Sequence, residues 1–218
     1  MAQKKGEYRD STCQTKSSKP NRGSFEKEGG PGYTSTIGPL TLETPGLGSG
    51  ELMCAAGTAK GEITGVRAGV ERITLSGCEM AGRQCASAGP DSTPSSTSGV
   101  VVTNLLATRL VGPEPGGAWT ELTSAEHEPY LFEFDCEGPL FRTTGSLAGV
   151  QGGNVNVQSL SSTTTFAIGE GEQALDTELS ENGGASWSGP EHSSAVGVAE
   201  NTAAEATEIK PTFWSSLE

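Results

Sequence analysis

Glycine and proline interrupt this chain so often that long regular helices are excluded. The 218 residues include 31 glycines and 12 prolines, distributed along most of the sequence. Inside a helix, glycine costs about 1 kcal/mol and proline about 3 kcal/mol relative to alanine. Short runs of valine, isoleucine, leucine, phenylalanine and threonine lie between these residues, which is the pattern of β-strands separated by turns. We therefore expect an all-β protein without a transmembrane segment, since no run approaches ~20 apolar residues.

The apolar runs also predict the architecture of the fold. About ten short strands, separated by roughly 8–15 residues, favour a single antiparallel β-sandwich or closed β-barrel with long Gly/Ser/Pro-rich loops. The most continuous apolar run, residues 100–110, predicts a central strand or a short helix. The clearest strand covers residues 130–136, where alternation gives two distinct faces. We expect Tyr130, Phe132, Phe134 and Cys136 on the core face, and Leu131, Glu133 and Asp135 on the solvent face.

Charge is distributed unevenly along the chain. The formal net charge is −13, yet residues 1–30 carry +3, from seven basic and four acidic residues, which leaves −16 for the rest. This asymmetry predicts a basic, largely extended N-terminal arm over residues 1–36 and an acidic β domain over residues 37–218. The arm could dock onto the acidic domain, stay solvated or meet an acidic partner. The acidic balance argues against nucleic acid as a partner, because phosphate binding needs a basic face.

The five cysteines predict disulfides rather than a metal site. They form no C-x-x-C pair and the chain has only two histidines, so we expect no structural zinc, no other metal and no cofactor. Cys78 and Cys85 flank a short polar loop, and a hairpin there would bring their sulfurs within bonding range. We therefore favour a Cys78–Cys85 bridge, with Cys54–Cys136 as the second bridge and Cys13 left over. The alternative is that all five are reduced, buried and small apolar residues of a cytosolic protein.

Glycine and cysteine landmarks recur along most of the chain. They are Gly6-Glu7-Tyr8 with Cys13, Cys54 with Gly61-Glu62-Ile63-Thr64-Gly65, Leu75-Ser76-Gly77-Cys78-Glu79, Cys85-Ala86-Ser87-Ala88-Gly89, and Cys136 with Gly145-Ser146. In these landmarks the chain resembles a group of uncharacterised, exported, cysteine-containing proteins of high-GC Gram-positive bacteria. The resemblance implies export and disulfide bonds. It implies no activity, so it assigns no functional residues.

The two ends of the sequence bear on localisation. The first residues lead into polar sequence rather than into the apolar segment of a secretion signal. The final Leu217-Glu218 is typical of residues left by cloning, so we expect a native signal peptide to be missing from this sequence. The Gly/Ser/Thr-rich composition with few lysines favours an extracellular or cell-surface location.

Few residues are suited to catalysis. Glu133 and Asp135 stand two apart on the predicted strand, at about 7 Å, which is a workable separation for a glycosidase carboxylate pair. His127 and His192 are the only histidines available as bases for serine hydrolysis. The segment Gly145-Ser146-Leu147-Ala148-Gly149 departs by one position from the Gly-x-Ser-x-Gly nucleophile elbow. We therefore expect Glu133 and Asp135 to be ordinary solvent-facing residues, with Glu133, Asp135 and His127 as the alternative catalytic set.

Tryptophan offers the better candidates for a binding surface. Trp187 lies among glycines and serines, and Trp119 follows a pair of glycines. Tryptophan exposed on a β scaffold can hold a sugar or a partner protein. We therefore predict a non-catalytic exported β protein for surface binding or structure, with carbohydrate or a cell-surface protein as its partner. The alternatives are a secreted glycosidase-like hydrolase and a self-assembling surface or fibre subunit.

Overall fold

The computed structural model describes Ser18 and residues 32–43, 50–65, 67–88, 97–114, 117–125, 130–152, 161–167, 173–180, 186–189 and 191–203. All regular secondary structure in these ranges is β-strand, which confirms the predicted all-β class. Among the same residues, no helix is long and apolar enough to cross a membrane.

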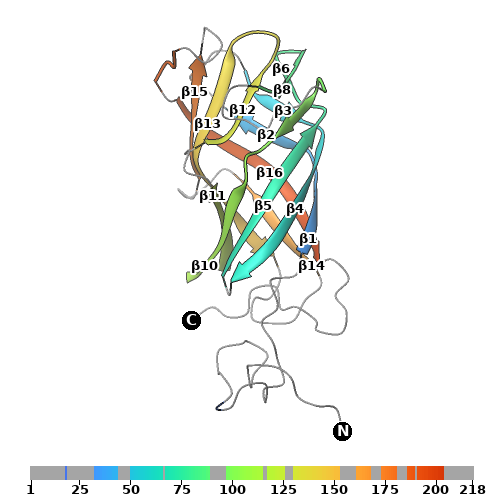
Figure 1. Ribbon diagram of the computed structural model, residues 1–218, viewed down its shortest axis with the longest axis vertical. Coiled ribbons are helices and arrows are strands. Elements are labelled where there is room, and N and C mark those ends of the chain that lie inside the picture. Colours follow the sequence, from blue (N-terminus) through green and yellow to red (C-terminus); the bar gives the residue numbers. More distant parts are fainter. Residues whose placement is uncertain are drawn as a thin grey trace.

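A closed, eight-stranded antiparallel barrel forms the body of the molecule (Figure 1). The sequence left a sandwich and a barrel open, and ring closure decides for the barrel: the last strand pairs with the first as well as with its other neighbours. In ring order the strands are β1 (Gly32–Ile37), β4 (Ala56–Gly65), β5 (Ala68–Ser76), β10 (Leu106–Glu114), β11 (Gly117–Ser124), β13 (Leu140–Gly152), β14 (Ser161–Phe166) and β16 (Glu191–Ala203).

Two of these strands, β13 and β16, run beyond the barrel into a second set of strands that we call the extension. Residues 140–146 of β13 pair with extension strands, whereas residues 147–152 pair with barrel strands. Strand β16 divides in the same way, because residues 191–196 pair with the extension and residues 197–203 with the barrel. The other strands of the extension are β2 (Leu40–Glu43), β3 (Leu52–Cys54), β6 (Glu79–Met80), β7 (Arg83–Gln84), β8 (Ala86–Ser87), β12 (Tyr130–Asp135) and β15 (Ala174–Ser180). The short strand β9 (Val100–Val102) pairs with residues 74–76 of the barrel strand β5.

Several predicted boundaries differ from the observed strands. Strand β1 begins at Gly32, so the predicted division at residue 37 falls at its end and residues 32–36 belong to the barrel wall. The apolar run 100–110 is not one element. It is split into β9 and β10: the Thr103 amide still bonds the Ile73 carbonyl of β5, whereas the Asn104 amide turns to the Leu131 carbonyl of β12. Strand β11 was not predicted, and the predicted strands at 154–160 and 207–210 lie outside the described residues.

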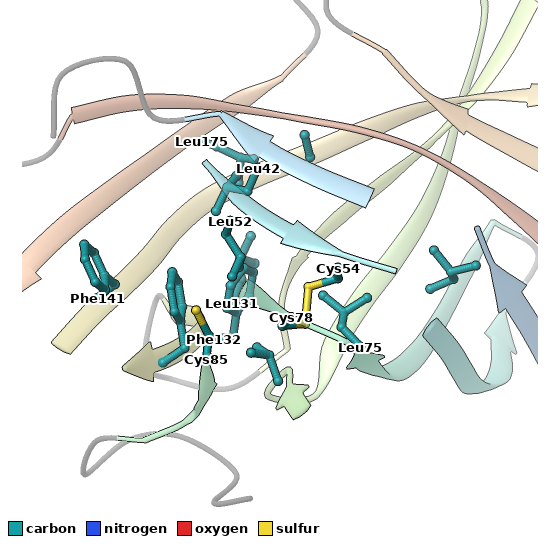
Figure 2. Close-up of a cluster of buried hydrophobic side chains, with 14 of the residues drawn as sticks. Leu42, Leu52, Cys54, Leu75, Cys78, Cys85, Leu131, Phe132, Phe141 and Leu175 are labelled. Carbon is teal, nitrogen blue, oxygen red and sulfur yellow. A yellow bond between two sulfur atoms is a disulfide. The ribbon is translucent and has the colours of Figure 1, made fainter. Parts of the chain in front are cut away.

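Apolar side chains from both parts of the molecule form one continuous core. Figure 2 shows this cluster where the extension meets the barrel, with the Cys54–Cys78 bridge beside Leu75 and with Cys85 beside Phe132. Leu52, Leu131 and Phe134 are fully buried there. Burial of such side chains is the main stabilising term in a fold of this kind, at about 1.5–3 kcal/mol each.

The four cysteines predicted to form disulfides do so, but the predicted pairing is wrong. The bridges are Cys54–Cys78 and Cys85–Cys136, each with 4.0 Å between its Cα atoms. The predicted hairpin does form, and the Cys85 amide donates a 2.9 Å hydrogen bond to the Cys78 carbonyl. In an antiparallel ladder, a hydrogen-bonded pair such as Cys78 and Cys85 is the wider kind, at about 5.5 Å between Cα atoms, and the adjacent pair is narrower. Cys78 and Cys85 therefore lie opposite each other at a wide pair and bond other cysteines.

The register explains which sulfurs join instead. Met53 pairs with Glu79, which sets the neighbouring Cys54 and Cys78 opposite each other. Asp135 pairs with Ala86, which does the same for Cys136 and Cys85. Each bridge therefore links strands across a narrow pair of the ladder. Two disulfides are consistent with an oxidising environment, and Cys13 lies outside the described residues.

Candidate functional site

A bulge in β12 creates the surface that we regard as the candidate binding site. Tyr130 pairs with Thr144 and Phe132 pairs with Thr143, so Leu131 is an extra residue in the ladder. A bulge of this kind shifts all side chains on one side of it to the opposite face. The predicted face assignment is therefore wrong for Tyr130 and Leu131: Tyr130 shares the outer face with Glu133, and Leu131 is fully buried.

Arg142 holds two aromatic rings together on this outer face. Its guanidinium carbon lies 3.4 Å from the centre of the Tyr130 ring and 3.9 Å from the centre of the Trp187 ring. Both rings remain partly exposed, whereas Arg142 is 6% exposed. A cation stacked between rings and shielded from water gains about 2 kcal/mol or more per contact. We call Tyr130, Arg142 and Trp187 the aromatic clamp.

Glu133 fixes Arg142 from the neighbouring strand. The Nε and Nη2 atoms of Arg142 donate to Glu133 Oε1 at 2.7 and 2.6 Å. Glu133 is 0% exposed, so its predicted place on the solvent side is wrong. The physical reason is that a buried carboxylate is tolerated where a guanidinium neutralises it. A carboxylate that acts on a sugar must reach the substrate, whereas Glu133 is fully buried and paired with Arg142.

Of the other residues in the alternative catalytic set, the structure describes Asp135. Asp135 is partly exposed and accepts a 3.2 Å hydrogen bond from the Glu137 amide, which is an ordinary turn contact. His127 lies outside the described residues. His192 instead bonds the Asp176 carboxylate at 2.9 Å, on a neighbouring strand pair.

Trp187 is held at the edge of the extension by backbone contacts. It forms a β-bridge with Ser180, and the amide of Ser188 donates a 2.7 Å hydrogen bond to the Leu179 carbonyl. Ser186, Ser188 and Gly189 around it are exposed. The ring is therefore fixed in place with polar groups at its rim, although the flanking sequence alone resembles a simple loop.

The strand register extends the aromatic clamp into a row of polar residues. Tyr130 pairs with Thr144, Thr144 with Asp176, and Asp176 with His192. Since adjacent strands lie about 4.8 Å apart, the row from Tyr130 to His192 spans about 14 Å. Glu178, opposite Arg142, lies on the same face. The row therefore places aromatic, acidic and imidazole groups along one surface.

A second group of polar residues lies inside the barrel, and sequence reasoning did not find it. The Tyr33 hydroxyl donates a 2.9 Å hydrogen bond to Glu71 Oε2, and the two side chains are 6% and 8% exposed. Burial raises the pKa of the Glu71 carboxyl above its ordinary value, and the bond from Tyr33 offsets part of that rise. Burial, followed by the nearby carboxylate, raises the pKa of Tyr33, so its phenol stays protonated and donates.

Two cavities of about 40 Å³ each lie in the interior. The first contains Glu71 and Tyr33, together with Gln151, whose amide oxygen accepts hydrogen bonds from Thr120 at 3.0 Å and Thr164 at 3.2 Å. The second is lined almost entirely by apolar side chains from the barrel and the extension. The wall residues common to both cavities are Ile37, Ile73, Leu122 and Phe166.

Trp119, the other predicted ligand-binding tryptophan, lies far along the ladder from the aromatic clamp. It is on β11, where it pairs with Val150. Val150 pairs with Thr165, which in turn pairs with Val198, and these two valines are 49% and 41% exposed. The structure therefore does not bring Trp119 and Trp187 into one site.

The described residues offer no ready-made metal centre, since no three histidine, cysteine, aspartate or glutamate side chains among them lie close enough to share an ion.

Comparison of the chain with known protein families, with curated proteins and with solved structures finds no match.

Proposed function

We propose that this protein is a non-catalytic, exported binding protein that holds a carbohydrate on the outer face of its extension. The aromatic clamp carries the proposal. Sugars bind proteins by stacking their C–H faces on aromatic rings and by hydrogen bonding through their hydroxyls. Tyr130 and Trp187 supply the rings, and the row through Asp176 to His192 supplies hydrogen-bonding groups.

Preorganisation favours a binding role for these residues. Arg142 is fixed by Glu133 and by both rings, so the clamp loses little side-chain freedom when a ligand binds. The row of about 14 Å matches an oligosaccharide of two or three units better than a single sugar. Two disulfides support an extracellular or cell-surface location, because such bonds persist in oxidising compartments.

A glycan array probed with the full chain tests this proposal. We expect wild type to bind at least one class of oligosaccharide, Trp187→Ala to lose at least tenfold in affinity, and Trp187→Phe to lose less. Trp119→Ala is the matched control, because it removes a tryptophan that lies beside Val150 in the barrel part of β13, whereas Arg142 lies in the extension part. The proposal fails if folded wild type binds no glycan, or if Trp187→Ala binds as tightly as Trp119→Ala.

Self-assembly is a second candidate, favoured by an apolar row on the barrel in which Val150 and Val198 are exposed and Trp119 is partly exposed. Trp119, Val150 and Val198 follow one another across β11, β13 and β16, with only Thr165 between the valines. Exposed apolar residues that adjoin one another commonly mark contact surfaces. Light scattering would show wild type to be larger than a monomer and Val150→Lys to be monomeric. Monomeric wild type at high concentration would exclude this candidate.

A further inference from the structure

From the geometry of the barrel interior, we infer a second binding site, independent of the proposed carbohydrate surface, for a small primary alkylammonium ion whose charged end sits on Glu71. The site is the polar cavity of about 40 Å³. Among the residues that the structure describes, Glu71 is the only charged one that lines it. A cation with hydrogen-bond donors is therefore the ligand that this wall complements.

Glu71 is available to such a ligand. Only Oε2 is engaged by Tyr33, at 2.9 Å, and no salt bridge to Glu71 is formed by the lysines, arginines and histidines that the structure describes. A buried carboxylate without a positive partner is costly, and an ammonium ion would remove that cost. The hydroxyl of Thr120 donates to Gln151, so its oxygen lone pairs remain suited to accept from the ligand.

The size and lining of the two cavities define the rest of the ligand. Each water-sized group needs about 10–15 Å³, so the polar cavity holds about three such groups and the apolar cavity holds about three more. The two share the wall formed by Ile37, Ile73, Leu122 and Phe166. A straight chain of about four carbons on an ammonium group would place its nitrogen at Glu71 and its alkyl end in the apolar cavity once rotation of these shared wall side chains joins the two cavities.

Charge on the chain supports the same class of ligand. The net charge of −13 raises the local concentration of cations near the surface. Burial favours the protonated form of Glu71, and Tyr33 is the only other titratable group among the described residues that line the cavity. The register partners of Glu71 are Gly61 and Leu106, which do not titrate. Binding of an ammonium ion would therefore release a proton from Glu71.

Calorimetry and thermal melts of the full chain with n-butylammonium chloride test the inference. We expect saturable 1:1 binding, with affinity rising roughly threefold to fourfold per methylene from methylammonium to butylammonium. Butan-1-ol, the neutral isostere, should bind at least tenfold more weakly. Tetraethylammonium chloride, which is too bulky for the cavity, controls for general attraction to an acidic protein and should not bind saturably.

Two variants locate the site. Glu71→Gln should lose butylammonium binding, whereas Glu62→Gln, which removes an exposed carboxylate from the neighbouring strand, should retain it. Heats measured in phosphate and in Tris should differ, because a proton is released into the buffer. The inference is wrong if wild type binds butylammonium no better than butan-1-ol, or if Glu71→Gln binds it like wild type. The wild-type comparison with butan-1-ol decides the matter even if Glu71→Gln does not fold.

Discussion

Gly61 lies directly opposite Tyr33 in the barrel wall, and the Tyr33 ring fills the space that a side chain at residue 61 would occupy. Gly61 also pairs with Glu71 on its other side. The phenol therefore crosses a whole strand, over the glycine, to reach the carboxylate. The hydrogen bond between Tyr33 on β1 and Glu71 on β5 therefore requires a residue without a side chain, Gly61, on the intervening strand β4.

Gly61→Ala should therefore destabilise the barrel. A methyl group at residue 61 would overlap the Tyr33 ring, and overpacking of this kind costs about 1–3 kcal/mol. Urea unfolding would measure the change. Gly32→Ala is the control, because its added methyl group would lie 3.7 Å from the nearest atom, the Gly61 carbonyl oxygen. Equal midpoints for the two variants would contradict the proposed ring position.

Glu71→Gln should change how stability depends on pH. The folded state raises the pKa of Glu71 above its ordinary 4.5, so it binds this proton more tightly than the unfolded chain does. Wild-type stability from this group is therefore greatest at low pH, and it declines as pH rises from about 4.5 through the raised folded pKa. Glutamine lacks this dependence and can still accept the bond from Tyr33.

The measurement is the free energy of unfolding of wild type and Glu71→Gln at several pH values between 4 and 8. We expect the variant to gain on wild type steadily as pH rises. Glu62→Gln, at an exposed position, should track wild type throughout. If the free energies of unfolding of wild type and Glu71→Gln changed with pH in parallel, the prediction that Glu71 is buried without a positive partner would be contradicted.

Arg142→Met should be strongly destabilising, because it leaves the fully buried Glu133 without a counter-charge. Removing one partner of a buried pair typically costs about 3–5 kcal/mol. The double variant Glu133→Leu/Arg142→Met should recover most of that loss, which a thermodynamic cycle from chemical denaturation would measure. Arg72→Met, at an exposed position, controls for the loss of a surface charge. Additive effects at residues 133 and 142 would argue against the ion pair.

The two disulfides should contribute unequally. They close loops with sequence separations of 24 and 51, for which loop-closure entropy predicts about 3.5 and about 4.1 kcal/mol respectively. Cys85→Ser/Cys136→Ser should therefore unfold at a lower temperature than Cys54→Ser/Cys78→Ser. Peptide mapping without reductant should first recover the fragment that joins Cys54 to Cys78. Recovery of a Cys78–Cys85 fragment would contradict the ladder described above.

The sequence predicts the class of the fold well because glycine, proline and alternation act locally. The strands predicted over residues 130–136 and 140–150 are observed as β12 (Tyr130–Asp135) and β13 (Leu140–Gly152). Ring closure could not be predicted, since it depends on the pairing of β1 with β16, which lie at opposite ends of the chain. The wrong disulfide pairing has a similar cause: the hairpin between Cys78 and Cys85 is local, whereas their partners are Cys54 on β3 and Cys136 just after β12.

The candidate sites could be predicted from the sequence only in part, because they depend on contacts between segments that are far apart in the chain. Trp187 could be singled out from its glycine and serine neighbours, but its contact with Arg142 could not. The bulge at Leu131 reversed the face of Tyr130, and no residue type in that strand signals a bulge. Glu71 sits in an ordinary alternating strand, so only the closure of the barrel reveals that it points inward. A lone tyrosine opposite a glycine is the one signal that could have suggested it.

The pairing of β1 with β16 also sets the order of events when the chain is made. The first strand of the barrel has no partner on one side until residues 191–203 have been synthesised. At about 5–20 residues per second, that interval is on the order of ten seconds. During it, β1 presents an open edge to other nascent chains. Closure of the ring therefore cannot precede the synthesis of residues 191–203, and a ribosome-bound chain truncated before residue 191 should remain sensitive to protease.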